Sequence, residues 1–238
     1  MGTVGASQLM LMAQGWLIFE LSGSPMDLGV LGAAVSGPAI IVLLFGGVLA
    51  DRFDRRVLLM TTSLITAVLL LVQAFLDYSG VVEVWHVLVL GCVIGIVTGF
   101  EWPVRQALFA KLITPAQMMS AVSLNAILWQ GSRMILPALA GVLIAAAGTS
   151  VVFALGALGF VGMFFTLVGM QVERQAAATG GTGQQFAGGI RFIFTNRTFL
   201  VLIPLTWVWM FFGFSFNQLM PVFANSLGTQ EIGFGALM

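Results

Sequence analysis

The sequence predicts an all-α polytopic membrane protein, a helical bundle with about seven transmembrane helices. Of its 238 residues, 59% are hydrophobic and 8% are charged, whereas about a quarter of the residues in an average soluble domain are charged. The mean hydropathy is +1.06, so many apolar side chains must face lipid rather than water. Net charge is zero, which gives the chain no general electrostatic attraction to nucleic acid.

The spans follow from apolar runs of about 20 residues, the length that crosses a bilayer as a helix. Backbone groups have no water to bind in lipid and must pair within each run, so each run is expected to be helical. A Ser-Gly-Ser-Pro turn closes the first run and a charged stretch closes the second. The expected spans are residues 3–21, 28–50, 57–76, 84–102, 118–147, 151–170 and 199–222.

Basic residues predict the orientation, because Lys and Arg are retained on the cytoplasmic side. Apart from Arg133, every Lys and Arg lies in the breaks after the second, fourth and sixth spans. The other breaks contain acids but neither Lys nor Arg. We therefore expect the start of the chain and the 171–198 linker to be cytoplasmic in a multi-pass protein.

Three domains are expected. Residues 1–170 form an N-terminal six-helix bundle with a truncated first helix, residues 171–198 a cytoplasmic linker, and residues 199–238 the incomplete beginning of a C-terminal bundle. The apolar spacing in 186–194 predicts a short amphipathic helix within the linker, with a plain linker as the alternative. The odd seventh span indicates a fragment of a longer protein, and a signal peptide is disfavoured because no basic residue precedes Arg52.

Two runs carry evenly spaced glycines. Such spacing gives a helix a smooth face on which another helix can pack closely. This structural role needs no catalytic or binding function. The glycines are Gly91, Gly95 and Gly99 in the fourth run, and Gly156, Gly159 and Gly162 in the sixth.

The most specific stretch lies between the second and third runs, at residues 47–56. It resembles the signature loop of the major facilitator superfamily, with Asp54 where that pattern has glycine. Within this superfamily, the loop resembles that of the exporter branch known as transmembrane secretion effectors. This branch includes siderophore exporters related to the enterobactin exporter. It implies that the chain is the first half, plus one helix, of a twelve-helix carrier. The matching residues are Gly47, Leu49, Ala50, Asp51, Arg52, Arg55 and Arg56.

Charges in this loop suggest a gate. Ion pairs at helix ends can form and break as helix bundles rock, and we expect the loop to stabilise the outward-open state. The alternative is a cluster that only sets topology. Glu101 and Arg105 lie four apart on one helical face, beside Pro103 in a segment similar to the same branch. Glu101 can also pair with Arg52 or Arg55, or the pair can simply be solvated.

A second resemblance covers residues 132–141, which are similar to the fifth-helix motif of proton-coupled antiporters. Ser132 begins the segment, and Pro137 and Gly141 match the motif. Leu136 and Ala140 occupy positions where glycines are usual, so both antiport and uniport stay open. Pro137 is expected to kink the helix in any family, because it removes one backbone hydrogen bond.

Polar residues at membrane depth are the candidates for binding substrate or coupling ion. Arg133 lies near the middle of its span and requires an anionic partner, which can be a substrate, an acid on further helices, or backbone carbonyls. Asn125, Trp129 and Arg133 form one stripe, with Gln130 beside it. Interhelical hydrogen bonding is the alternative role for each polar residue. The further candidates are Gln14, Asn217 and Gln218.

The inventory argues against an enzyme and a channel. One His and one Cys cannot build the usual metal site, Lys111 is not in a phosphate-binding loop, and we expect neither cofactor nor metal. Nothing repeats to form a selectivity ring. We predict a secondary, proton-driven exporter of small amphipathic molecules or siderophores in the bacterial cytoplasmic (inner) membrane. Its partners would be lipid, substrate and protons, with a monomeric full-length protein. The alternatives are a uniporter or importer of the same superfamily, or a non-functional half-carrier.

Overall fold

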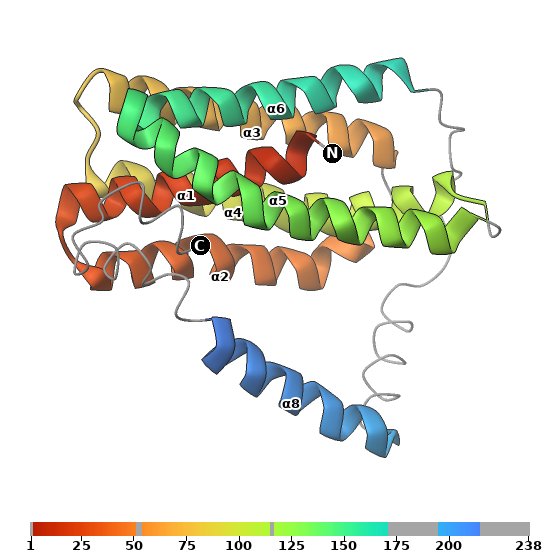
Figure 1. Cartoon of the computed structure of the whole chain (residues 1–238). Helices are drawn as coiled ribbons and strands as arrows, with labels where there is room; N and C mark the ends of the chain where they lie inside the picture. The colour runs from red at the N-terminus through yellow and green to blue at the C-terminus, as the bar shows by residue number, and fades with distance from the viewer. Residues whose placement is uncertain (1, 51–53, 115–116, 171–194, 215–238) are drawn as a thin grey trace.

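The structure is a computed structural model that describes residues 2–50, 54–114, 117–170 and 195–214. Regular structure in these residues is entirely helical (Figure 1). This confirms the predicted all-α class. The helices are α1 (Gly2–Ser22), α2 (Pro25–Ala50), α3 (Arg55–Tyr78), α4 (Val84–Leu112), α5 (Met118–Ala147), α6 (Thr149–Gly169) and α8 (Arg197–Phe214).

Most helix bounds agree with the expected spans to within a few residues, but α4 is a clear exception. It was expected to end at residue 102 and instead continues to Leu112. An apolar run marks the part of a helix that can lie in lipid and not the end of the helix, and Glu101 and Arg105 pair along the continuation. The expected amphipathic helix at 186–194 lies outside the described residues.

Within the described residues, helices α2 to α6 are each long and apolar enough to cross a membrane. Two of the seven expected spans are not among these five helices: α1, which has 21 residues, and α8, whose described apolar part, Thr198–Phe212, is shorter than a span. The chain is therefore polytopic. Figure 1 shows α8 beside the bundle of α1 to α6 rather than within it.

Helix α1 runs through the bundle and packs on α5 and α6, while α2 packs along α4 and α3 packs along α6. Residues 12–18 of α1 are all buried, because neighbours surround that part of the helix. The core there is apolar and includes Ile18, Leu70, Phe153 and Phe160. This packing buries α1 in an apolar core, which also holds a few polar side chains such as Gln14 and Gln73.

The glycines of α4 bring its backbone against α2. A Cβ atom added at Gly95 would lie 2.1 Å from the Val35 carbonyl oxygen, and one at Gly99 would lie 2.8 Å from the Ala39 carbonyl oxygen. This confirms the close packing predicted for the first glycine series. In the second series, a Cβ at Gly156 would make ordinary contacts with Leu70 and Ala6, and one at Gly162 would meet nothing within 4 Å.

Gly95→Ala should lower the free energy of unfolding by about 1–3 kcal/mol, because the new methyl group must push α2 and α4 apart. The measurement is the thermal unfolding midpoint of the full-length protein in detergent. Gly29→Ala in α2 is the matched control, since a Cβ there meets nothing within 4 Å. Equal midpoints for the two variants would contradict the close contact.

Candidate functional site

The signature loop joins α2 to α3, and Asp54 shapes its second half. Gly47, Leu49 and Ala50 belong to the last turns of α2, and Asp51 and Arg52 lie outside the described residues. Asp54 is the N-cap of α3, where its carboxylate accepts a 2.9 Å hydrogen bond from the Arg56 backbone N–H. The backbone at Asp54 is extended, with φ −62° and ψ 117°. Aspartate at the pattern's glycine position thus begins the helix by satisfying an unpaired backbone donor.

Arg56 reaches from the start of α3 to the end of α6. Its Nε donates to the Leu167 carbonyl at 2.7 Å, and one terminal nitrogen donates to the Val168 carbonyl at 2.8 Å. The last carbonyls of a helix have no partner within the helix and carry partial negative charge. A forked guanidinium satisfies two of them at once, so the signature loop is attached to α6.

The other end of α6 is bound by the same neighbour. Thr149, the first residue of α6, donates its hydroxyl to the carboxylate of Asp77 near the end of α3. An acid near a helix N-terminus and a base near its C-terminus both oppose the helix dipole favourably. Helix α3 thus places complementary groups at both ends of α6, and the two helices are antiparallel. Asp77 was not predicted to have this role, because its partner lies 72 residues further along the chain.

We use the term arginine-rich end for the bundle end that carries Arg55, Arg56 and Arg105. There, Arg105 donates from a terminal nitrogen to Glu101 one turn earlier in α4. Glu101 is 4% exposed, so this pair is largely removed from water. The Arg105 Nε atom is also buried and has no hydrogen-bond partner. The structure therefore gives Glu101 a partner on its own helix, Arg105; of the two candidates in the signature loop, Arg52 and Arg55, Arg52 lies outside the described residues.

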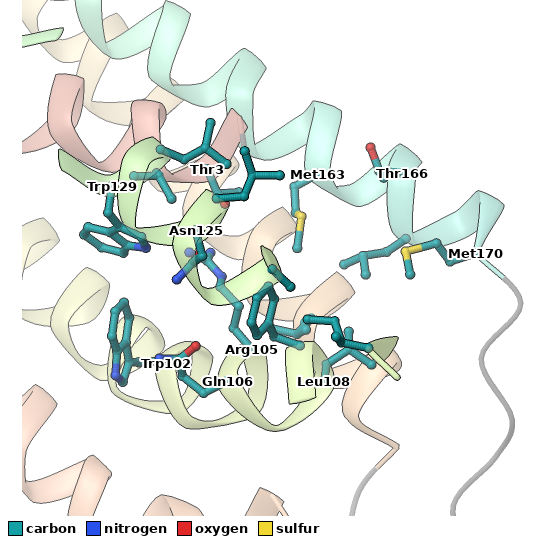
Figure 2. Close-up of a pocket in the computed structure, with 18 residues that line it drawn as sticks. Thr3, Trp102, Arg105, Gln106, Leu108, Asn125, Trp129, Met163, Thr166 and Met170 are labelled. Carbon is teal, nitrogen blue, oxygen red and sulfur yellow. The ribbon is translucent and has the colours of Figure 1, made fainter. Parts of the chain in front are cut away.

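A pocket of about 390 Å³ opens beside this pair, between the ends of α4 and α6 and the beginnings of α1 and α5 (Figure 2). Trp102 and Trp129 form an edge-to-face pair with ring centroids 5.2 Å apart. In Figure 2, Met163 of α6 and Met170, which directly follows α6, lie across the pocket from this pair. Its lining includes Trp102, Arg105, Gln106, Asn125, Trp129 and Met163.

The predicted stripe on α5 is divided by the structure. Asn125 and Trp129 are half-buried and line the pocket, while Gln130 and Arg133 are exposed. Trp102 and Gln106 were not predicted as pocket residues, because the sequence does not show which face of α4 lies opposite α5.

The fifth-helix motif lies where α5 packs on the bundle. Pro137 and Gly141 are buried and Ser132 is half-buried. Pro137 lies inside a helix that continues from Met118 to Ala147. A Cβ atom added at Gly5 of α1 would lie 3.0 Å from the Leu136 side chain, so this segment of α5 closely approaches α1.

The remaining polar candidates lie elsewhere. Gln14 is 2% exposed and donates to the Gln73 side-chain oxygen at 3.1 Å, which links α1 to α3 inside the bundle. Asn217 and Gln218 lie outside the described residues. Among the residues that the structure describes, no three His, Cys, Asp or Glu side chains gather as a metal site.

These apolar helices, with charged groups at one end and a pocket beside them, define a multi-pass membrane protein with a binding-sized cavity. A family model described as "Transmembrane secretion effector" matches residues 2–238. The chain therefore belongs to this family of major facilitator superfamily transporters, as its signature loop predicted.

Three curated relatives agree with this membership. An uncharacterised MFS-type transporter, YfiS of Bacillus subtilis, is 30% identical over 142 residues, which are 60% of this chain and 33% of the relative. Macrolide efflux protein A of Streptococcus pyogenes is 25% identical over 226 residues, or 91% of this chain and 54% of the relative. The staphyloferrin A transporter of Staphylococcus aureus is 26% identical over 135 residues, which are 55% of this chain and 33% of the relative. The chain thus spans between a third and about half of these relatives.

Asp54→Ala should lower the free energy of unfolding by about 1 kcal/mol, because α3 loses its N-cap. Asp54→Gly, which restores the family pattern, should cost only a few tenths of that amount, since glycine is an acceptable N-cap. The measurement is the thermal unfolding midpoint in detergent of the full-length wild-type protein and of the two variants. An alanine variant as stable as the wild type would show that the cap does not support α3.

Arg56→Ala should speed backbone amide exchange in the last turns of α6 about tenfold, because two charge-assisted hydrogen bonds are lost there. The exchange rate in Arg56→Lys should fall between those of the wild type and Arg56→Ala, since an ammonium retains the charge but lacks the planar fork. Hydrogen–deuterium exchange with peptide-level mass spectrometry measures the effect. Peptides near Thr149 are the internal control, and unchanged exchange at residues 163–169 would contradict the role of Arg56.

Proposed function

We propose that the full-length protein is a secondary active exporter that moves small amphipathic molecules or siderophores across the bacterial inner membrane. The observation that carries this proposal is the similarity to macrolide efflux protein A, which extends over 91% of the chain. The pocket at the arginine-rich end supports it, because it joins aromatic surface to a few polar groups, as small-molecule sites generally do.

In this proposal the arginine-rich end faces the cytoplasm, in keeping with the retention of basic residues on that side. Residues 1–170 form the first bundle, residues 171–198 the cytoplasmic linker, and residues 199–238 the beginning of the second bundle. Substrate crosses as the two bundles rock about a site between them. The full-length carrier is monomeric and performs no enzymatic reaction.

The signature loop would control this motion. Arg56 ties the loop to the end of α6, immediately before the proposed linker, so movement of the loop and movement of the linker are mechanically connected. Buried charges at such an end are costly unless paired, which favours a small number of discrete arrangements over a continuum. We propose that one of them stabilises the outward-open state.

Protons are the proposed driving ion, and the fifth-helix motif of Ser132, Pro137 and Gly141 supports antiport. A uniporter or importer of the same superfamily is the second candidate, favoured by Leu136 and Ala140 in place of the motif's glycines. Arg133 on the α5 stripe would meet an anionic substrate group or an acid of the second bundle.

The test is accumulation of a radiolabelled macrolide by bacteria that lack their major efflux pumps and express the full-length protein. We expect accumulation several-fold below that of cells with empty vector, and equal accumulation after a protonophore collapses the gradient. Asp51→Asn in the signature loop should restore accumulation, whereas Gly29→Ala should not. Equal accumulation with and without the protein would contradict macrolide export, and export that survives the protonophore would contradict proton coupling.

A further inference from the structure

The pocket at the arginine-rich end carries a more specific conclusion about its ligand. It is lined by residues of α1, α3, α4, α5 and α6. Its volume of about 390 Å³ lies within the range of roughly 300–1,000 Å³ typical of small-molecule sites. The pocket can therefore hold a ligand of two fused rings with a polar substituent.

The polar groups of the pocket favour a ligand that accepts hydrogen bonds. Arg105, Gln106 and Asn125 line it, and none of the described lining residues is acidic. The Arg105 terminal nitrogen that binds Glu101 leaves the buried Nε without an acceptor. An unsatisfied buried donor is costly, and a small shift of the guanidinium toward a ligand carboxylate would supply the missing acceptor.

The apolar groups favour a flat ligand. Trp102 is 44% exposed and meets Trp129 edge to face, so one indole ring still presents a face to the space beside it. Met163 and Met170 lie on the opposite side of the pocket (Figure 2). Methionine side chains adapt their shape and make favourable contacts with aromatic rings. Together these walls fit an aromatic body between indole and thioether.

We infer that this pocket binds a small aromatic carboxylate, with the ring between the tryptophan pair and the methionines and the carboxylate on Arg105. If the bound molecule is a transported substrate, the inference rests on the proposed export function. The claim that the pocket binds such a molecule stands independently, because binding can be measured without transport. The carboxylate competes with Glu101 for one guanidinium, so the ligand would loosen a buried pair at the arginine-rich end.

The probes are radiolabelled 2-naphthoate and its uncharged analogue 2-naphthamide, bound at equilibrium to the full-length protein in nanodiscs of phosphatidylcholine. The two probes share the ring, so their affinity ratio isolates the carboxylate. We expect 2-naphthoate to bind about tenfold more tightly, the effect of a charge-assisted hydrogen bond.

The double variant Glu101→Gln/Arg105→Gln removes both charges together and leaves no buried charge unpaired. It should reduce the affinity ratio to about one while 2-naphthamide still binds. Trp129→Leu should weaken both probes about threefold to tenfold and keep the ratio. Trp85→Leu, in the same helix as Trp102 but outside the pocket lining, is the matched control and should change neither affinity.

The inference would be overturned if each probe bound the wild type and all variants with the same affinity. It would also be overturned if binding were no greater than to protein-free nanodiscs, because the probes would then only partition into lipid. The two proposals fail separately. The expected binding pattern without macrolide export would retain the pocket and reject the exporter. Export without that binding pattern would retain the exporter and reject the pocket.

Discussion

Helix α6 is held at both ends by one neighbour, and much of the arginine-rich end depends on that arrangement. Asp77 of α3 binds the first residue of α6, and Arg56 of α3 binds its last carbonyls. Each contact places a charge of the favourable sign at a helix end, and each satisfies polar groups that the end of a helix leaves without a partner. Because α6 is fixed in this way, Leu167 and Met170 are in place as one wall of the pocket.

Close backbone contact between α2 and α4 fixes the wall of the pocket opposite α6. Gly95 and Gly99 let α4 lie directly on α2, so the continuation of α4 that carries Trp102 and Arg105 has a defined direction. The Glu101–Arg105 pair, one turn apart, supports the helical conformation of that continuation. Glycines in the middle of α4 and an ion pair at its end therefore act together to orient the polar wall of the pocket.

The sequence was sufficient for the fold class, because long apolar runs admit few alternatives in a membrane, and for the family, because the signature loop retains most of its residues. It was insufficient where a partner comes from a distant part of the chain. Gln14 was a candidate for the cavity, yet it binds Gln73, and Asp77 gave no local sign of its contact with Thr149. The pocket itself was invisible because it depends on where α4 ends and on which residues of α5 oppose it.

The proposal that two bundles rock about a site between them predicts that the face of α5 with Gln130 and Arg133, both exposed, opens to the two sides of the membrane in turn. Gln130→Cys, combined with Cys92→Ser and replacement of any other cysteine in the full-length protein, reports this exposure through a membrane-impermeant thiol reagent. The reagent is applied separately to right-side-out and inverted vesicles. The account predicts labelling from both sides, with a macrolide shifting the ratio of the two rates. Labelling from one side alone under every condition, or from neither side, would contradict alternating access at this stripe.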